Sequence, residues 1–165
     1  MIFNIIKPSG WTSFDVVKKI RGITKHKKVG HAGTLDPFAT GVLIVGTQKD
    51  TKILNIISSS YKTYEAVLEL GKSTDTLDID GKIISNENIP SLNNEKIKFV
   101  LESFKGKSSQ IPPMFSAKKI NGTRLYKLAR KGISIKRNPI AIHIKRIELL
   151  YYKKPFLSFR VECSK

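Results

Sequence analysis

The sequence predicts an α+β fold, because helical and strand-like patterns are both present and occupy separate segments. Near the C-terminus, Ile140, Ile142 and Ile144 fall at every second position, which is the period of a strand. Residues 94–104 instead carry apolar side chains at helical spacing. A chain of 165 residues is long enough for a real core, and we expect one domain over residues 1–165.

The N-terminal segment predicts a strand followed by a helix. An apolar run at residues 2–6 ends at a Pro- and Gly-containing turn. Thr12 and Asp15 have the spacing of a capping box, and the apolar residues after them predict a helix over residues 13–25. The basic residues 25–28 are either a solvated helix end favoured by the helix dipole or a phosphate contact beside the next loop.

Three elements are expected in the middle of the chain: a buried strand over residues 42–45, a short helix over 50–57 and a half-buried strand over 61–71. Tyr64 begins the apolar face of the third, either as a core residue or as a platform for a stacked RNA base. The helix over residues 94–104 is closed by Gly106. Its expected inward side chains are Ile97, Val100, Leu101 and Phe104.

The remaining segments are strand-like or acidic. A change of phase in the strand that starts at Ile140 predicts a β-bulge, and a second alternating strand covers residues 157–163. Asp75, Asp78 and Asp80 lack the ligand spacing of a calcium loop, so we expect them to hold basic side chains or to shape a turn.

One carboxylate lies in a segment rich in glycine, threonine and proline, residues 30–43. The glycines permit backbone angles barred to other residues, and Pro37 restricts both itself and Asp36. The segment should therefore hold Asp36 rigidly beside the imidazole of His31. The alternative is an ordinary glycine-rich turn in which Asp36 caps a helix.

The chain is strongly basic, with 30 Lys+Arg, 13 Asp+Glu and a net charge of +17. Such a charge attracts polyanions, which makes nucleic acid the first partner to consider, although a lysine-rich composition accounts for part of the excess. No apolar run reaches the length of a membrane span. The single cysteine, Cys163, excludes an internal disulfide and a cysteine zinc site. We expect a cytoplasmic protein without a metal.

A second basic region surrounds a predicted hairpin. Asn121-Gly122 is a strong signal for a two-residue hairpin turn. The basic residues around it are Lys118, Lys119, Arg124, Lys127, Arg130 and Lys131. We expect this surface to bind RNA through Lys118, Lys119 and Arg124.

Five blocks in order resemble one family, the bacterial tRNA pseudouridine synthase B proteins. They are Asn4 to Ser13 with its Lys-Pro-Ser-Gly core, Gly30 to Gly41, Lys62-Thr63-Tyr64, Thr74 to Gly81, and Ile111 to Lys119. Each block alone would be weak, but five in the same order over nearly the whole chain are specific.

The resemblance implies a pseudouridine synthase fold: a mixed, largely antiparallel sheet flanked by helices, here incomplete at the C-terminus. It implies isomerisation of the T-loop uridine of tRNA, uridine 55, without a cofactor, by a monomer that binds the T-stem-loop. Asp36 would be the catalytic carboxylate, His31 would contact the RNA, and Tyr64 would stack on the flipped uracil.

The resemblance also sets an expectation about activity. In the family, the segment after Cys163-Ser164-Lys165 continues into a Gly-Thr-Tyr-Ile-Arg motif whose arginine pairs with the catalytic Asp, and members are about twice as long. We therefore expect this chain alone to be a severely impaired enzyme or a tRNA-binding and RNA-folding module. A structural protein of ribosomal type would explain the charge but not the Asp36 segment.

Overall fold

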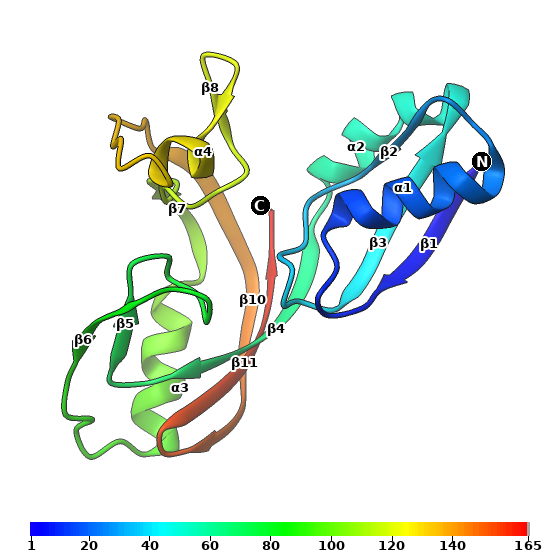
Figure 1. Ribbon diagram of the computed structural model, residues 1–165. Helices are drawn as coiled ribbons and strands as arrows, with labels where there is room; N and C mark the ends of the chain where they lie inside the picture. Colours follow the sequence, from blue (N-terminus) through cyan, green and yellow to red (C-terminus); the bar gives the residue numbers. More distant parts are fainter. Residues whose placement is uncertain (165) are drawn as a thin grey trace. The chain divides into compact units, whose positions relative to one another are not determined.

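The computed structural model describes residues 1–164 and divides into two compact units, Met1–Ser60 and Tyr61–Lys165, each with its own sheet (Figure 1). Helices and strands are both present, and every strand pair within the described residues is antiparallel. The α+β class is therefore confirmed.

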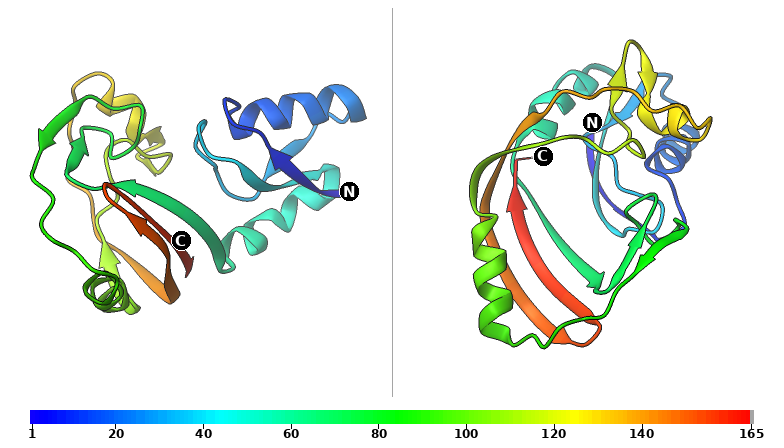
Figure 2. Two further views of the ribbon diagram at one scale, coloured as in Figure 1. Left: turned by 90° about the horizontal axis from the view of Figure 1, so that it is seen from below. Right: turned by 90° about the vertical axis from the view of Figure 1, so that its left-hand side faces the viewer.

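The first unit is a three-stranded sheet in the order β1-β3-β2 with a helix on each face (Figure 2). Its elements are β1 (Ile2–Lys7), α1 (Ser13–Thr24), β2 (Val29–His31), β3 (Gly41–Thr47), the 3-10 helix η1 (Gln48–Lys52) and α2 (Leu54–Ser59). Val16 of α1 packs against Leu43 and Val45 on one face. On the other, a Cβ at Gly46 would lie 3.1 Å from Leu54 of α2, so the absence of a side chain permits close packing.

The predicted strand–helix pair at the N-terminus is confirmed. Thr12 caps α1, and its side chain and backbone exchange hydrogen bonds with Asp15 in a complete capping box. The helix expected over 50–57 is divided, because the N–H of Ile53 bonds the Asp50 carbonyl three residues back and closes a tighter 3-10 turn before α2. Strand β2 has only three residues, too few to show a period in the sequence.

The second unit is built on a four-stranded sheet in the order β4-β11-β10-β7. Its elements are β4 (Lys62–Glu69), β5 (Lys72–Thr74), β6 (Ile83–Asn86), α3 (Asn94–Ser103), β7 (Gly106–Gln110), β8 (Lys119–Ile120), β9 (Thr123–Arg124), α4 (Leu125–Ala129), β10 (Ile140–Lys153) and β11 (Phe156–Cys163). Helix α3 lies along one face of the large sheet (Figures 1 and 2). Within residues 1–164, no helix is long and apolar enough to cross a membrane.

Two of the four residues expected on the inward face of α3 are in fact exposed. Ile97 and Leu101 are buried in the core against the sheet, but Val100 and Phe104 are 53% and 57% exposed. Neighbouring residues point about 100° apart around a helix, so a narrow contact with the sheet admits the i, i+4 pair and turns Val100 outward.

Three turn-level predictions hold. The register of β10 against β11 shifts between Ile144 and Arg146, as expected for a bulge. Asn121 and Gly122 both have positive φ, at 48° and 79°, which joins β8 to β9 by a tight hairpin turn. The acidic residues 75–80 shape a turn, as expected: the carboxylate of Asp75 accepts the backbone N–H of Lys82 at 2.8 Å.

Candidate active site

Asp36 lies on the connection between β2 and β3, residues 32–40, and is exposed. The base of this connection is fixed by the sheet, because His31 pairs with Val45 and the Ala32 N–H donates to the Ile44 carbonyl at 2.9 Å. Gly33 has a φ of +97°, a conformation that strains other residues. The connection is therefore a shaped loop on a rigid sheet.

The N-terminal block holds this loop on both sides of Asp36. Before Asp36, Leu35 donates its N–H to Ser13 Oγ at 2.9 Å and accepts a bond from the same hydroxyl at 3.2 Å. After it, the Pro37 carbonyl accepts the Gly10 N–H at 2.8 Å, and Ser9 Oγ lies 3.1 Å from the carbonyl of Phe38. The stiff presentation of Asp36 comes from these long-range bonds as much as from the glycines and proline of the loop.

Lys7 is the least expected member of the site. It is fully buried, and its ammonium donates to the carbonyls of Trp11 at 2.7 Å, Pro8 at 2.9 Å and Pro37 at 3.3 Å. Burial lowers the pKa of Lys7, and the negative charge of Asp36 acts in the opposite direction. A cation is therefore coupled to Asp36 within the first unit. Sequence reasoning missed this role, although a lysine that ends an otherwise apolar strand is a usable signal.

His31 is half-buried at the end of β2. Its Nδ1 lies within hydrogen-bond distance of the Gly33 carbonyl, and because a carbonyl only accepts, Nδ1 must carry the proton. This bond fixes the ring to the start of the loop and leaves Nε2 as the atom that can meet another molecule. The expected RNA contact by His31 stays a prediction.

Tyr64 belongs to the second unit. It lies on β4 directly opposite Val161 of β11, and 37% of its surface is exposed. That position agrees with either the core or the stacking role, so stacking on uracil also stays a prediction.

The basic hairpin keeps its charges at the surface. Lys118, Lys119 and Arg124 are all exposed. Lys119 and Arg124 are also direct cross-strand partners, an arrangement of like charges that destabilises a strand pair. Neither forms an ion pair within the described part of the chain. A bound anion would relieve this repulsion.

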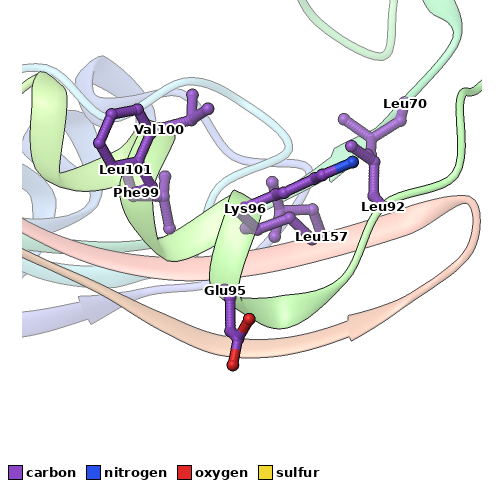
Figure 3. Close-up of a pocket in the computed structure, with 9 residues that line it drawn as sticks. Leu70, Leu92, Glu95, Lys96, Phe99, Val100, Leu101 and Leu157 are labelled. Atoms are coloured by element: carbon purple, nitrogen blue, oxygen red, sulfur yellow. The ribbon is translucent and has the colours of Figure 1, made fainter.

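A mostly apolar pocket lies in the second unit, away from the predicted site residues. It has a volume of about 600 Å³ and sits beside α3 in the second unit (Figure 3). Its apolar lining includes Leu70, Leu92, Phe99, Val100 and Leu157, and none of the predicted site residues. Glu95 and Lys96 of α3 also line it, but nearly all of its lining surface is apolar, which does not suit a phosphate.

The fold agrees with solved structures of two RNA-related complexes. The chain superimposes on a chain of a Cbf5-Nop10-Gar1 complex with a TM-score of 0.71 at 28% identity, covering 98% of this chain and 39% of that one. An H/ACA RNP bound to a substrate RNA containing 2'-deoxyuridine gives 0.65 at 25% identity, covering 98% of this chain and 37% of that one. These matches define the class as proteins with the pseudouridine synthase fold.

Residues 21–165 match the family model described as the N-terminal domain of TruB family pseudouridylate synthases. The chain belongs to this family. It is 49% identical to the tRNA pseudouridine synthase B of Clostridium acetobutylicum, over 99% of this chain and 56% of that protein. It is 48% identical to the tRNA pseudouridine synthase B of Protochlamydia amoebophila, over 99% of this chain and 62% of that protein. The chain thus spans little more than half the length of these relatives.

Proposed function

We propose that this chain is the N-terminal part of the catalytic domain of a tRNA pseudouridine synthase that isomerises uridine 55 in the T loop. The observation that carries the proposal is the exposed Asp36 on a loop clamped by Ser13 and by the turn after β1. The names of the relatives, tRNA pseudouridine synthase B, supply the reaction and the substrate class.

The reaction breaks the N-glycosidic bond of uridine and forms a C-glycosidic bond, with no change of oxidation state. A single carboxylate suffices, either as a nucleophile or as a base that removes a proton from the sugar. Asp36 takes that role in either route. It must be ionised, and the positive charge of Lys7 favours its ionised form.

The uridine must leave its stack before a carboxylate can reach the glycosidic bond, at a cost of a few kcal/mol. An aromatic face and hydrogen bonds to the everted base offset that cost. We assign the aromatic face to Tyr64 and a polar contact to His31 Nε2. We assign Lys118, Lys119 and Arg124 of the hairpin to RNA phosphates, because their exposed and mutually repelling charges favour an anion.

The test is tritium release from a T-stem-loop RNA labelled at C5 of uridine, because isomerisation exchanges that hydrogen. Because the chain spans little more than half the length of its relatives, the informative quantity is the part of the release that depends on Asp36. Asp36→Asn should abolish it, whereas Asp80→Asn, at an exposed acidic residue of the second unit, should not.

Two results would contradict the proposal. Release that is equal in wild type and Asp36→Asn would remove Asp36 from the chemistry. Sequence-specific binding of the T-stem-loop with no release at all would instead favour the tRNA-binding module.

A further inference from the structure

Four residues form a stripe along the exposed face of α1: Phe14, Lys18, Arg21 and Lys25, here called the α1 ridge. The spacing of Phe14, Lys18 and Arg21 places these three on one side of the helix, and the exposed Lys25 follows as the residue that ends it. The buried residues of α1, Ser13, Val16 and Val17, follow a separate helical face. The ridge is thus a continuous surface feature about 16 Å long at 1.5 Å per residue.

The ridge begins beside the Asp36 loop. Ser13, the neighbour of Phe14, makes the two hydrogen bonds to Leu35 that hold the loop. Both features lie in the first unit, Met1–Ser60, so their relation is fixed by that unit's own packing. A polyanion whose reacting nucleotide reaches Asp36 therefore has the ridge within its reach.

Within residues 1–164, Lys18, Arg21 and Lys25 form no ion pair. The carboxylate of Asp15 accepts hydrogen bonds from Thr12 and acts on Lys18 only through space. The helix dipole favours cations in the last turn, which accounts for Arg21 and Lys25 but not for Lys18.

Two residue choices on this side of α1 lower the stability of the helix. Gly22 lies in the last turn of the helix, where a Cβ would meet nothing within 4 Å, so a better helix former would be tolerated. Lys25 ends the helix in the left-handed conformation, with a φ of 55°, where glycine would be unstrained. A small residue between cations, and a cation where glycine is preferred, are expected of a surface that a partner approaches closely.

We propose that the α1 ridge binds the phosphate backbone of the RNA stem that adjoins the modified loop. This inference rests on the proposed function, since it takes the substrate to be RNA. Three successive cations match phosphates, and the nearby carboxylate of Asp15 is already bonded to Thr12, so they can position the stem without reading its bases. Phe14 is 52% exposed, has Lys18 Nζ 5.3 Å from its ring centroid, and offers a stacking face at the loop end.

The test is binding of a fluorescent T-stem-loop RNA between about 50 and 200 mM salt, a range over which phosphate contacts dominate the salt dependence. The ridge variant carries Lys18→Gln, Arg21→Gln and Lys25→Gln. The control removes the same charge at three exposed lysines of the second unit, Lys98→Gln, Lys107→Gln and Lys153→Gln. Circular dichroism and melting confirm that both variants are folded.

The ridge variant should bind at least about tenfold more weakly at 0.1 M salt, with a slope of log affinity against log salt reduced by about 2–3. The control should keep most of the slope. Gly22→Glu should weaken binding, whereas Gly22→Ala should weaken it much less.

If the ridge variant loses no RNA affinity, or loses no more than the control, the proposed role of the α1 ridge is refuted, while the proposed function remains intact. Asp36-dependent tritium release reports on that function separately. A wild-type chain that neither binds the RNA nor releases tritium would overturn both.

Discussion

Replacing Lys7 with methionine tests whether a buried ammonium holds the Asp36 loop in place. Methionine is similar in length and apolar, so the cavity stays filled while the charge is lost. Three carbonyls lose their donor: those of Pro8, Trp11 and Pro37. The last of these is the residue that follows Asp36.

Two opposing effects set the size of the change. A hydrogen bond from a charged donor contributes about 1.5–3 kcal/mol, and an unsatisfied buried carbonyl is unfavourable. Methionine, however, removes the unfavourable burial of a charge, which is also what lowers the pKa of Lys7. We expect a net destabilisation of about 1–3 kcal/mol, equivalent to a melting temperature lower by about 2–12 °C for a chain of this size.

Thermal melting measures the stability change, and hydrogen exchange of the amides in residues 30–41 measures the loop. Lys7→Met should accelerate exchange in this segment, because the Pro37 end of the loop loses its anchor. Lys19→Met is the matched control, since Lys19 is exposed on α1 of the same unit and should change stability by less than about 0.5 kcal/mol. If Lys7→Met has the melting temperature and loop exchange of Lys19→Met, the clamp argument is refuted.

Three further changes test the surroundings of the loop. Ser13→Ala removes both bonds to Leu35, so denaturant unfolding should show a loss of about 1–3 kcal/mol; an unchanged midpoint would contradict the clamp. Hydrogen bonds from Thr12 lower the pKa of Asp15, so its contribution is present above the ordinary carboxyl pKa and lost as pH falls through the lowered one. The difference in melting temperature between Asp15→Asn and wild type should therefore vanish in acid, and a constant difference would be contrary evidence. Gly22→Ala should raise stability by about 0.5–1 kcal/mol in urea unfolding, and a loss would mean that the new methyl group meets a neighbour.

Local patterns in the sequence were enough to predict the elements whose apolar pattern repeats over many residues and the turns with specific residue requirements. The capping box of Thr12 and Asp15 and the turn at Asn121-Gly122 depend on contacts within a few residues, and the bulge after Ile144 shows as a change of phase in its own strand. Strands β2 and β7 were missed, because pairing with β3 and β10 rather than their own short sequences creates them.

The site divides in the same way. Asp36 could be singled out because glycines and a proline surround it, and the structure leaves it exposed at the surface. The clamp could not be predicted, since the Ser13 bonds to Leu35 join residues 22 positions apart and depend on how α1 packs. The burial of Lys7 was equally hidden, because only the folded backbone supplies the three carbonyls that make a buried ammonium tolerable.

The clamp and the α1 ridge depend on the same first turn of α1. Ser13 and Phe14 are adjacent and point about 100° apart, so the rotation of the helix that brings Ser13 to Leu35 also directs Phe14 and the following cations to the surface. The capping box fixes where that helix begins, and therefore which residues take each direction. If α1 began one residue earlier or later, Ser13 would lose its bonds to Leu35, and the ridge side chains would turn about 100° around the helix axis. The position of the Asp36 loop and the direction of the ridge side chains therefore both depend on the residue at which α1 begins.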